Sequence, residues 1–376
     1  AINNIGSISN IGSLSNTGQI TGTSVGIKNI GTISSLTNNT GGTISGGSIA
    51  GVQNNNTLSS LVNNSLISGS VGVLNTGSMN TLSNTGDIHG VSAGIRNSGL
   101  ISGLVNSGSI SGTSYGVHSD NGSQINFLVN TSTGVIEGGT GFLAGNLTPS
   151  GTININTLNN AGQISGTTNV GVGTSTNGTI GSLINSGVIT GALGAVANAG
   201  SIGSLANSGT ISSSNYAIYN ASIGTLGPIT NSGLIAGMIY NGSSNDLTFN
   251  GGSDATFGTL TGSSGGTGSA DIGLINSTYA NVYFDSGNLL LNDNVNVGSF
   301  ALRNTGSTLQ VNNLVSISGN YAQSTAATLL IGVGDSAVSN GVTADTGYGR
   351  LVVSGAATID SGSTVALKSL NTYKFA

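Results

Sequence analysis

Short apolar segments recur along the first 240 residues at a nearly constant spacing, and stretches of Gly, Asn, Ser and Thr separate them. The tripeptide Asn-[Ser/Thr]-Gly marks this rhythm. It ends at Gly86, Gly99 and Gly108, so the gaps of 13 and 9 residues sum to a period of 22. A repeat of this length predicts a solenoid, because each repeat is too small to bury its own apolar face and must stack on its neighbours.

Three apolar positions per repeat form columns down the sequence. The first column is Ile20, Ile44, Ile67, Ile88, Ile110, Ile136, Ile164, Ile189, Ile211 and Ile235. The second is Leu14, Leu36, Leu61, Leu82, Leu104, Leu128, Leu158, Leu183, Leu205 and Leu226. The third includes Ile27, Val73, Ile95, Val117, Val172, Val196, Ile218 and Ile239. We therefore expect an all-β chain that forms a right-handed parallel β-helix, a three-faced β-solenoid of about 22 residues per coil. The Gly and Asn residues between strands predict corners with positive φ.

The composition argues against several other classes of protein. A helical fold is incompatible with 65 Gly residues, and a disordered chain would lack apolar residues at fixed places. Charged residues make up 5% of the chain and the net charge is −5, so the basic stripe that nucleic-acid binding requires is missing. The same shortage of basic residues argues against binding to an anionic membrane surface. The absence of Cys excludes disulfides and thiolate metal sites.

The rhythm divides the chain into three parts. Residues 1–240 are expected to form regular coils, although residues 121–160 carry extra residues, including Phe127 and Phe142, that predict a loop or a longer strand. Residues 241–310 are expected to form irregular coils with a Gly/Ser-rich loop at 262–269. Residues 311–376 predict a β-rich C-terminal cap that covers the open edge of the last coil.

The C-terminal part contains three motifs in a fixed order. Gly319-Asn320-Tyr321-Ala322-Gln323 is followed by the strand-like Leu329-Leu330-Ile331, and then by Tyr348-Gly349-Arg350-Leu351-Val352-Val353-Ser354-Gly355. As a set, these motifs resemble the junction of bacterial autotransporters (type V secretion), and the resemblance covers about 60 residues of the C-terminal part. It implies that this region is an autochaperone, that the chain is a secreted passenger, and that an outer-membrane barrel lies outside this chain. The Asn-Ser-Gly repeats also look like the passengers of self-associating adhesins.

Candidate catalytic, cofactor-binding and metal sites are not expected. The regular part has only three scattered acids, Asp87, Asp120 and Glu137, whereas β-helical glycan-cleaving enzymes need acidic pairs. Gly334-Asp335-Ser336 looks like a serine-hydrolase fragment but is read as a loop before a strand. A Ca²⁺ site at Asp285, Asn292 and Asp293 has a spacing that fits no known calcium loop. His89 and His118 are expected to be exposed surface groups rather than metal ligands.

One set of residues predicts a binding surface. Leu74, Arg96 and His118 are 22 residues apart, and each directly follows a core residue. Since neighbouring strand residues point to opposite faces, the three are expected to stack as one outward column. Tyr219 and Tyr240 occupy the same place in later coils. The column is open to two interpretations. It is an ordinary solvated face, or it is part of a surface that binds a partner, because Tyr and Arg are enriched at interface hot spots. In the second case the binding residues would be Arg96, His118, Tyr219 and Tyr240.

Two functions are consistent with these observations. In the first, the chain is a non-enzymatic adhesin on the surface of a Gram-negative bacterium, promoting cell–cell aggregation, biofilm formation or host attachment. Its partners would be other copies of itself, or a host surface protein or glycan, and not nucleic acid. In the second, the chain is the stalk of a secreted enzyme or toxin whose active domain lies upstream. The chain begins within the repeat, so it is expected to be an internal or processed fragment.

Overall fold

The computed structural model describes residues 1–4, 9–146, 151–338 and 346–374. The protein is all-β, with 68% of residues in strands and 1% in helix, and it forms a parallel β-solenoid of about 13 turns with roughly 24 residues per turn. The predicted fold class is confirmed. The average turn exceeds the predicted 22 residues because some coils are longer, such as those that separate Ile110, Ile136 and Ile164.

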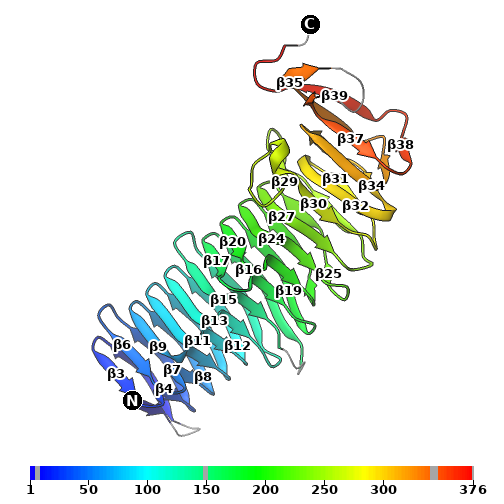
Figure 1. Cartoon of the computed structure of the whole chain (residues 1–376). Coiled ribbons are helices and arrows are strands. Elements are labelled where there is room, and N and C mark those ends of the chain that lie inside the picture. Colours follow the sequence, from blue (N-terminus) through cyan, green and yellow to red (C-terminus); the bar gives the residue numbers. More distant parts are fainter. Residues whose placement is uncertain (5–8, 147–150, 339–345, 375–376) are drawn as a thin grey trace. The chain divides into compact units, whose positions relative to one another are not determined.

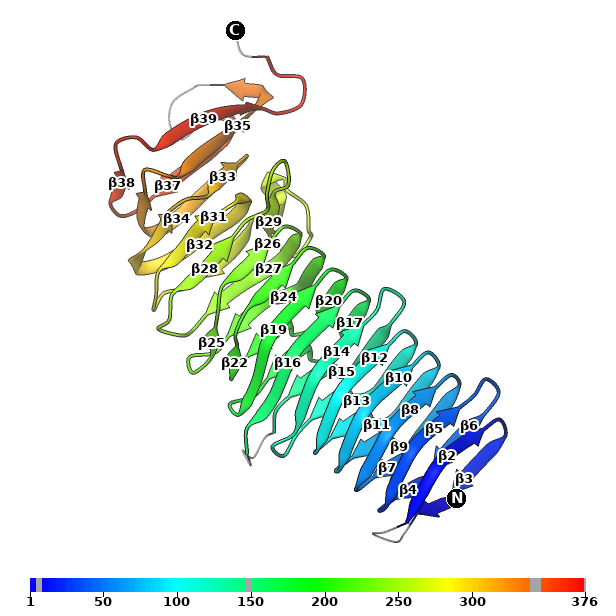
Figure 2. The same cartoon turned by 180° about the vertical axis from the view of Figure 1, so that it is seen from behind.

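The chain divides into two compact units, residues 1–203 (unit 1) and 204–376 (unit 2). Figures 1 and 2 show the stacked strands of each unit from two sides. The division into 1–240, 241–310 and 311–376 stays a prediction. No helix in the described ranges is long and apolar enough to cross a membrane.

Unit 1 is built from three series of parallel strands. The first series is β2 (Asn10–Asn16), β5 (Thr32–Asn38), β8 (Thr57–Asn63), β10 (Ser78–Asn84), β12 (Leu100–Asn106), β14 (Gln124–Asn130), β16 (Ile153–Asn160), β19 (Gly178–Asn185) and β22 (Ser201–Ile202). The second is β3 (Gln19–Gly22), β6 (Thr43–Gly46), β17 (Gln163–Gly166) and β20 (Val188–Gly191), and the third is β1 (Ile2–Asn4), β4 (Val25–Asn29), β7 (Ala50–Asn54), β18 (Val170–Thr174) and β21 (Gly194–Asn198). In the middle coils the second and third series merge into the longer strands β9 (Leu66–Asn75), β11 (Asp87–Asn97), β13 (Ser109–Ser119) and β15 (Val135–Ala144).

Unit 2 begins with similar coils, and its strands then become less even in length. The early strands are β23 (Leu205–Asn207), β24 (Thr210–Asn220), β25 (Thr225–Leu226), β26 (Ile229–Asn231), β27 (Leu234–Asn241), β28 (Leu247–Asn250) and β29 (Gly258–Thr261). The short 3-10 helix η1 (Ser269–Asp271) follows, then β30 (Gly273–Asn276), β31 (Val282–Ser286), β32 (Asn288–Asn304), β33 (Thr308–Val311) and β34 (Leu314–Gln323). The last strands are β35 (Thr328–Val338), β36 (Thr346–Tyr348), β37 (Arg350–Val353), β38 (Ala357–Ile359) and β39 (Thr364–Ser369), of which β36 pairs antiparallel with β35.

The three apolar columns form the core. Ile88 pairs with Ile110, Leu82 with Leu104, and Ile95 with Val117, and all six side chains are fully buried. The third column also contains Phe142, which pairs with Val117 and is fully buried, so placing it in an insertion was wrong. The assignment of Leu226 was also wrong. The residue that pairs with Leu205 in the next coil is Ile229 and not Leu226. The strand is interrupted between β25 and β26, and the N–H of Leu205 donates to the carbonyl of Pro228.

The corner glycines serve a different purpose from the predicted one. Gly86, Gly99 and Gly108 are not among the residues with positive φ. A Cβ on Gly108 would instead lie 2.0 Å from the carbonyl oxygen of Gly86 in the preceding coil. These positions therefore exclude side chains because consecutive corners stack backbone on backbone.

The Asn residues that precede these glycines point inward rather than to the turn. In unit 1 they form two buried ladders in which each Nδ2 donates to the Oδ1 of the next Asn at 2.8–2.9 Å. The longer ladder is Asn16, Asn38, Asn63, Asn84, Asn106, Asn130, Asn160 and Asn185, and the shorter is Asn4, Asn29, Asn54, Asn75 and Asn97. Unit 2 repeats the link between Asn207 and Asn231 and between Asn220 and Asn241. Each ladder satisfies buried polar groups that would otherwise destabilise the core.

The C-terminal region is rich in strands, as predicted, and its coil continues the core columns. Val365 and Leu367 in β39 pair with Leu329 and Ile331 in β35. Val365 is 57% exposed and Leu367 is 59% exposed, and Ile359 in β38 is 55% exposed. That residues 311–376 cap the last coil stays a prediction.

Candidate functional site

The three residues of the predicted column are aligned in register in unit 1. Arg96 pairs with Leu74 on one side and with His118 on the other, on the consecutive strands β9, β11 and β13. The register continues toward the N-terminus, where Gln53 pairs with Leu74 and Lys28 pairs with Gln53. Both basic residues of unit 1, Lys28 and Arg96, therefore stand in one column, although sequence reasoning had linked only Arg96 to it.

Arg96 is engaged in an ion pair. Its Nε lies 2.7 Å from Oδ2 of Asp120, and the carboxylate is fully buried while the Arg96 side chain is 45% exposed. Ser98 donates a second hydrogen bond, from its hydroxyl to Oδ1 of the same carboxylate. A buried carboxylate is stable only with such partners, so the guanidinium serves the fold as well as the surface.

His118 is buried, so its expected exposure was wrong. Its Nε2 lies 2.8 Å from the carbonyl oxygen of Gly145, and the ring of Tyr115 stacks on the imidazole with centroids 4.3 Å apart. Burial lowers the pKa of His118, and the positive charge of Arg96 adds to this, whereas the Gly145 carbonyl and Asp120 oppose it. The imidazole of His118 is thus packed into the structure rather than presented to solvent. His89 is exposed, as expected, and its Nδ1 lies 3.0 Å from the hydroxyl of Ser111.

Tyr219 and Tyr240 form a second cluster, which lies in unit 2. The two residues pair in register on β24 and β27, and their rings stack with centroids 5.2 Å apart and planes 13° apart. Tyr216, which the sequence pattern did not single out, lies edge-on to both rings. Together they form a partly exposed aromatic patch of the kind that is favoured at interfaces.

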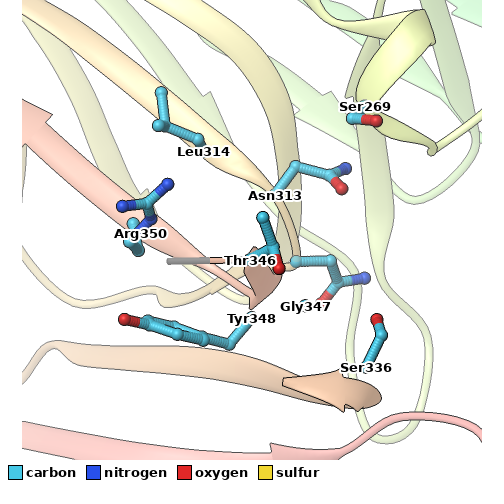
Figure 3. Close-up of a pocket in the computed structure, with 9 residues that line it drawn as sticks. Ser269, Asn313, Leu314, Ser336, Thr346, Gly347, Tyr348 and Arg350 are labelled. Atoms are coloured by element: carbon cyan, nitrogen blue, oxygen red, sulfur yellow. The ribbon is translucent and has the colours of Figure 1, made fainter. Parts of the chain in front are cut away.

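Unit 2 also contains a polar pocket of about 340 Å³, shown in Figure 3. Arg350 and Tyr348, from the motif that resembles an autochaperone, lie on one side of it, and Ser269 and Ser336 lie on the opposite side. The guanidinium carbon of Arg350 is 5.8 Å from the centre of the Tyr348 ring, close enough for a cation–π contact. Asn313 is fixed between Asn292 and the carbonyl of Thr267. Sequence reasoning missed the pocket because its walls come from separate elements.

The residues considered for chemistry are dispersed. Asp285 is exposed and accepts a hydrogen bond from Thr305, whereas Asp293 is fully buried. Burial raises the pKa of Asp293 well above its usual value, and the backbone N–H of Gly273 beside it opposes this only in part. Asp335 accepts a hydrogen bond from the hydroxyl of Thr372. Within the described residues, no three His, Cys, Asp or Glu side chains come together as a metal-binding group.

Comparison with known proteins adds no family. No family model matches the chain, and no curated protein is similar to it. The fold itself, a parallel β-solenoid, is typical of autotransporter passengers.

Proposed function

We propose that the protein is the passenger of an autotransporter and acts as an adhesin that joins cells through association between its own copies. The solenoid fold is compatible with this role, and the motifs of the C-terminal part resemble the region that ends such passengers. The chain would then be displayed on the surface of a Gram-negative bacterium. Its lack of charge removes the repulsion that normally keeps copies of a protein apart.

One observation carries the proposal: outward polar side chains are aligned in register over four consecutive coils. Ser13, Ser35, Ser60 and Thr81 form one such column on β2, β5, β8 and β10. Strands in register are about 4.8 Å apart, so two copies that lie side by side can repeat the same contact at every coil. Each hydrogen bond contributes only about 0.5–1.5 kcal/mol net, but a series of them offsets the entropy lost on association.

Clumping of bacteria that display the protein tests this function. Cells with the unmodified protein should settle together, whereas a variant with Ser35→Glu, Ser60→Glu and Thr81→Glu should settle more slowly, because three aligned carboxylates repel their copies. The matched control is Ser35→Thr, Ser60→Thr and Thr81→Ser, which keeps every hydroxyl and adds no charge. Surface amounts are equalised with an antibody. Equal clumping by the glutamate variant and the control would argue against association through this column.

A further inference from the structure

His89, Ser111 and Glu137 form an outward column on the neighbouring strands β11, β13 and β15 of unit 1 (Figure 1). Ser111 pairs in register with His89 on one side and with Glu137 on the other. His89 and Glu137 are exposed, and the residue before each of them is a fully buried Ile of the first apolar column. Since neighbouring strand residues point to opposite faces, the column faces away from the core.

The two ionisable residues of this column stand at equal distances from Ser111. One coil separates each of them from it, which is about 4.8 Å along the solenoid. The Nδ1 atom of His89 lies 3.0 Å from the hydroxyl of Ser111. Within the ranges that the structure describes, no ion pair involves His89 or Glu137. Both side chains are therefore available to a partner of opposite charge.

The column is nearly symmetric about Ser111 beyond this ionisable pair. One coil further out it presents Ser68 on one side and Ser165 on the other. Two coils further out it presents Ser45 and Thr190. A half-turn about an axis through Ser111 therefore places hydroxyls on hydroxyls and exchanges the two ionisable residues.

We propose that two copies of the chain pair antiparallel through this column, about a twofold axis at Ser111. The axis places His89 of each copy opposite Glu137 of the other, so a dimer contains two ion pairs when the imidazoles are protonated. Parallel copies in register would instead place His89 opposite His89 and Glu137 opposite Glu137, and like charges repel. The charges thus select the antiparallel arrangement.

The other groups on this face are compatible with the pairing. β9 and β13 flank β11 and place the uncharged Ser68 and Ser111 beside His89. Asp87 precedes His89 by two residues and shares its face of β11. Asp87 and Val135 both pair with Ser109, so Asp87 stands opposite Val135 of the second copy. It therefore meets no like charge across the contact.

This inference rests on the association of copies proposed above and adds its orientation and its pH dependence. Copies displayed by two facing cells approach from opposite directions, so antiparallel pairing joins cells. Histidine changes charge between about pH 5 and 8, so association should be about fivefold tighter at pH 5.5 than at pH 7.5. The hydroxyl contacts remain at the higher pH.

Cysteine cross-linking of the purified chain tests the orientation. The chain contains no Cys, so an introduced thiol can be linked only to a second copy. Ser111→Cys lies on the axis and should form dimers with a short bismaleimide cross-linker at pH 6.5. Ser45→Cys is the matched control, because its equivalent in the second copy lies six coils away, roughly 29 Å. Alone it should stay monomeric, and mixed with Thr190→Cys it should cross-link.

Sedimentation velocity at pH 5.5 and 7.5 tests the charges. Glu137→Lys should weaken association at pH 5.5 by about tenfold, because Lys meets the protonated His89 of the second copy. Adding the His89→Glu variant should restore association between the two. The double variant with His89→Glu and Glu137→Lys should associate at both pH values alike. Asp360→Lys, which reverses an exposed charge in unit 2, should behave as the parent, and circular dichroism should show that all variants remain folded.

The outcomes separate this inference from the proposed function. A chain that associates but cross-links no better through Ser111→Cys than through Ser45→Cys contradicts antiparallel pairing and leaves the adhesin function standing. Unchanged association of Glu137→Lys at pH 5.5 contradicts the pairing as well. A chain that is monomeric under all these conditions overturns both proposals.

Discussion

The Nδ2 atom of Asn84 donates a 2.8 Å hydrogen bond to Oδ1 of Asn106 one coil further along, and both side chains are fully buried. The same Nδ2 donates to the backbone carbonyl of Ser109. Each ladder residue therefore links coils through its side chain as well as its strand. All amides in a ladder point the same way, so neighbouring hydrogen bonds polarise and strengthen one another.

Breaking a ladder should destabilise unit 1. Asn106→Ala removes the acceptor for Asn84 and leaves Oδ1 of Asn130 without its donor. We expect the free energy of unfolding to fall by about 2–4 kcal/mol, since each unsatisfied buried group costs about 1–3 kcal/mol. Urea unfolding followed by circular dichroism measures this. The control is Asn55→Ala, whose side chain is exposed and should change stability by less than about 0.5 kcal/mol.

The corner glycines should not tolerate a methyl group. Gly108→Ala places a Cβ 2.0 Å from a backbone carbonyl, so the coil must shift, at an expected cost of about 1–3 kcal/mol. Gly103→Ala is the matched control, because the nearest atom to its Cβ would be 3.7 Å away. Thermal melting temperatures compare the two variants. Equal melting temperatures would show that close backbone stacking is not the reason for glycine at this corner.

The buried His118 should make unit 1 sensitive to mild acid. Its folded-state pKa is below the usual 6.5, so the unfolded chain takes up the proton first. Stability should therefore be full above pH 6.5 and fall as the pH drops from there toward the folded-state pKa. In the His118→Gln variant the unfolding midpoint should change less with pH between pH 7.5 and 5 than it does in the parent. His89→Gln changes an exposed residue and should leave the parent's pH dependence of the midpoint unaltered.

Asp293 should have the opposite effect in unit 2. Its folded-state pKa is well above the usual 3.8, so its contribution to stability is complete below pH 3.8 and is lost as the pH rises toward the folded-state pKa. Asp293→Asn keeps the shape of the side chain but replaces the carboxyl group with an amide that does not ionise. Its unfolding midpoint should exceed that of the parent increasingly as the pH is raised, while Asp285→Asn, which is exposed, follows the parent.

The sequence predicts the core well because an apolar residue at a fixed period has few alternatives to burial. It predicts the ladders poorly because Asn before Gly is usually a turn signal, and only the stacking of identical coils gives the buried amide a partner. The period placed Arg96 and His118 in one column correctly. It could not show that Asp120 neutralises Arg96 or that Tyr115 covers His118, since both contacts depend on side-chain direction around a corner.

The pocket of Arg350 lay beyond sequence reasoning for a related reason. Its lining residues come from five separate segments of unit 2. The repeat spacing of the sequence identifies residues that stack within one column. It carries no information about cavities that form between residues of different segments.

Sedimentation velocity of the purified protein over a range of protein and salt concentrations tests the proposed adhesin function most directly. We expect reversible association that grows with protein concentration and persists at high salt, because the aligned contacts are polar and uncharged and are little screened by ions. A protein that stays strictly monomeric at high concentration would contradict association between copies as the basis of its function.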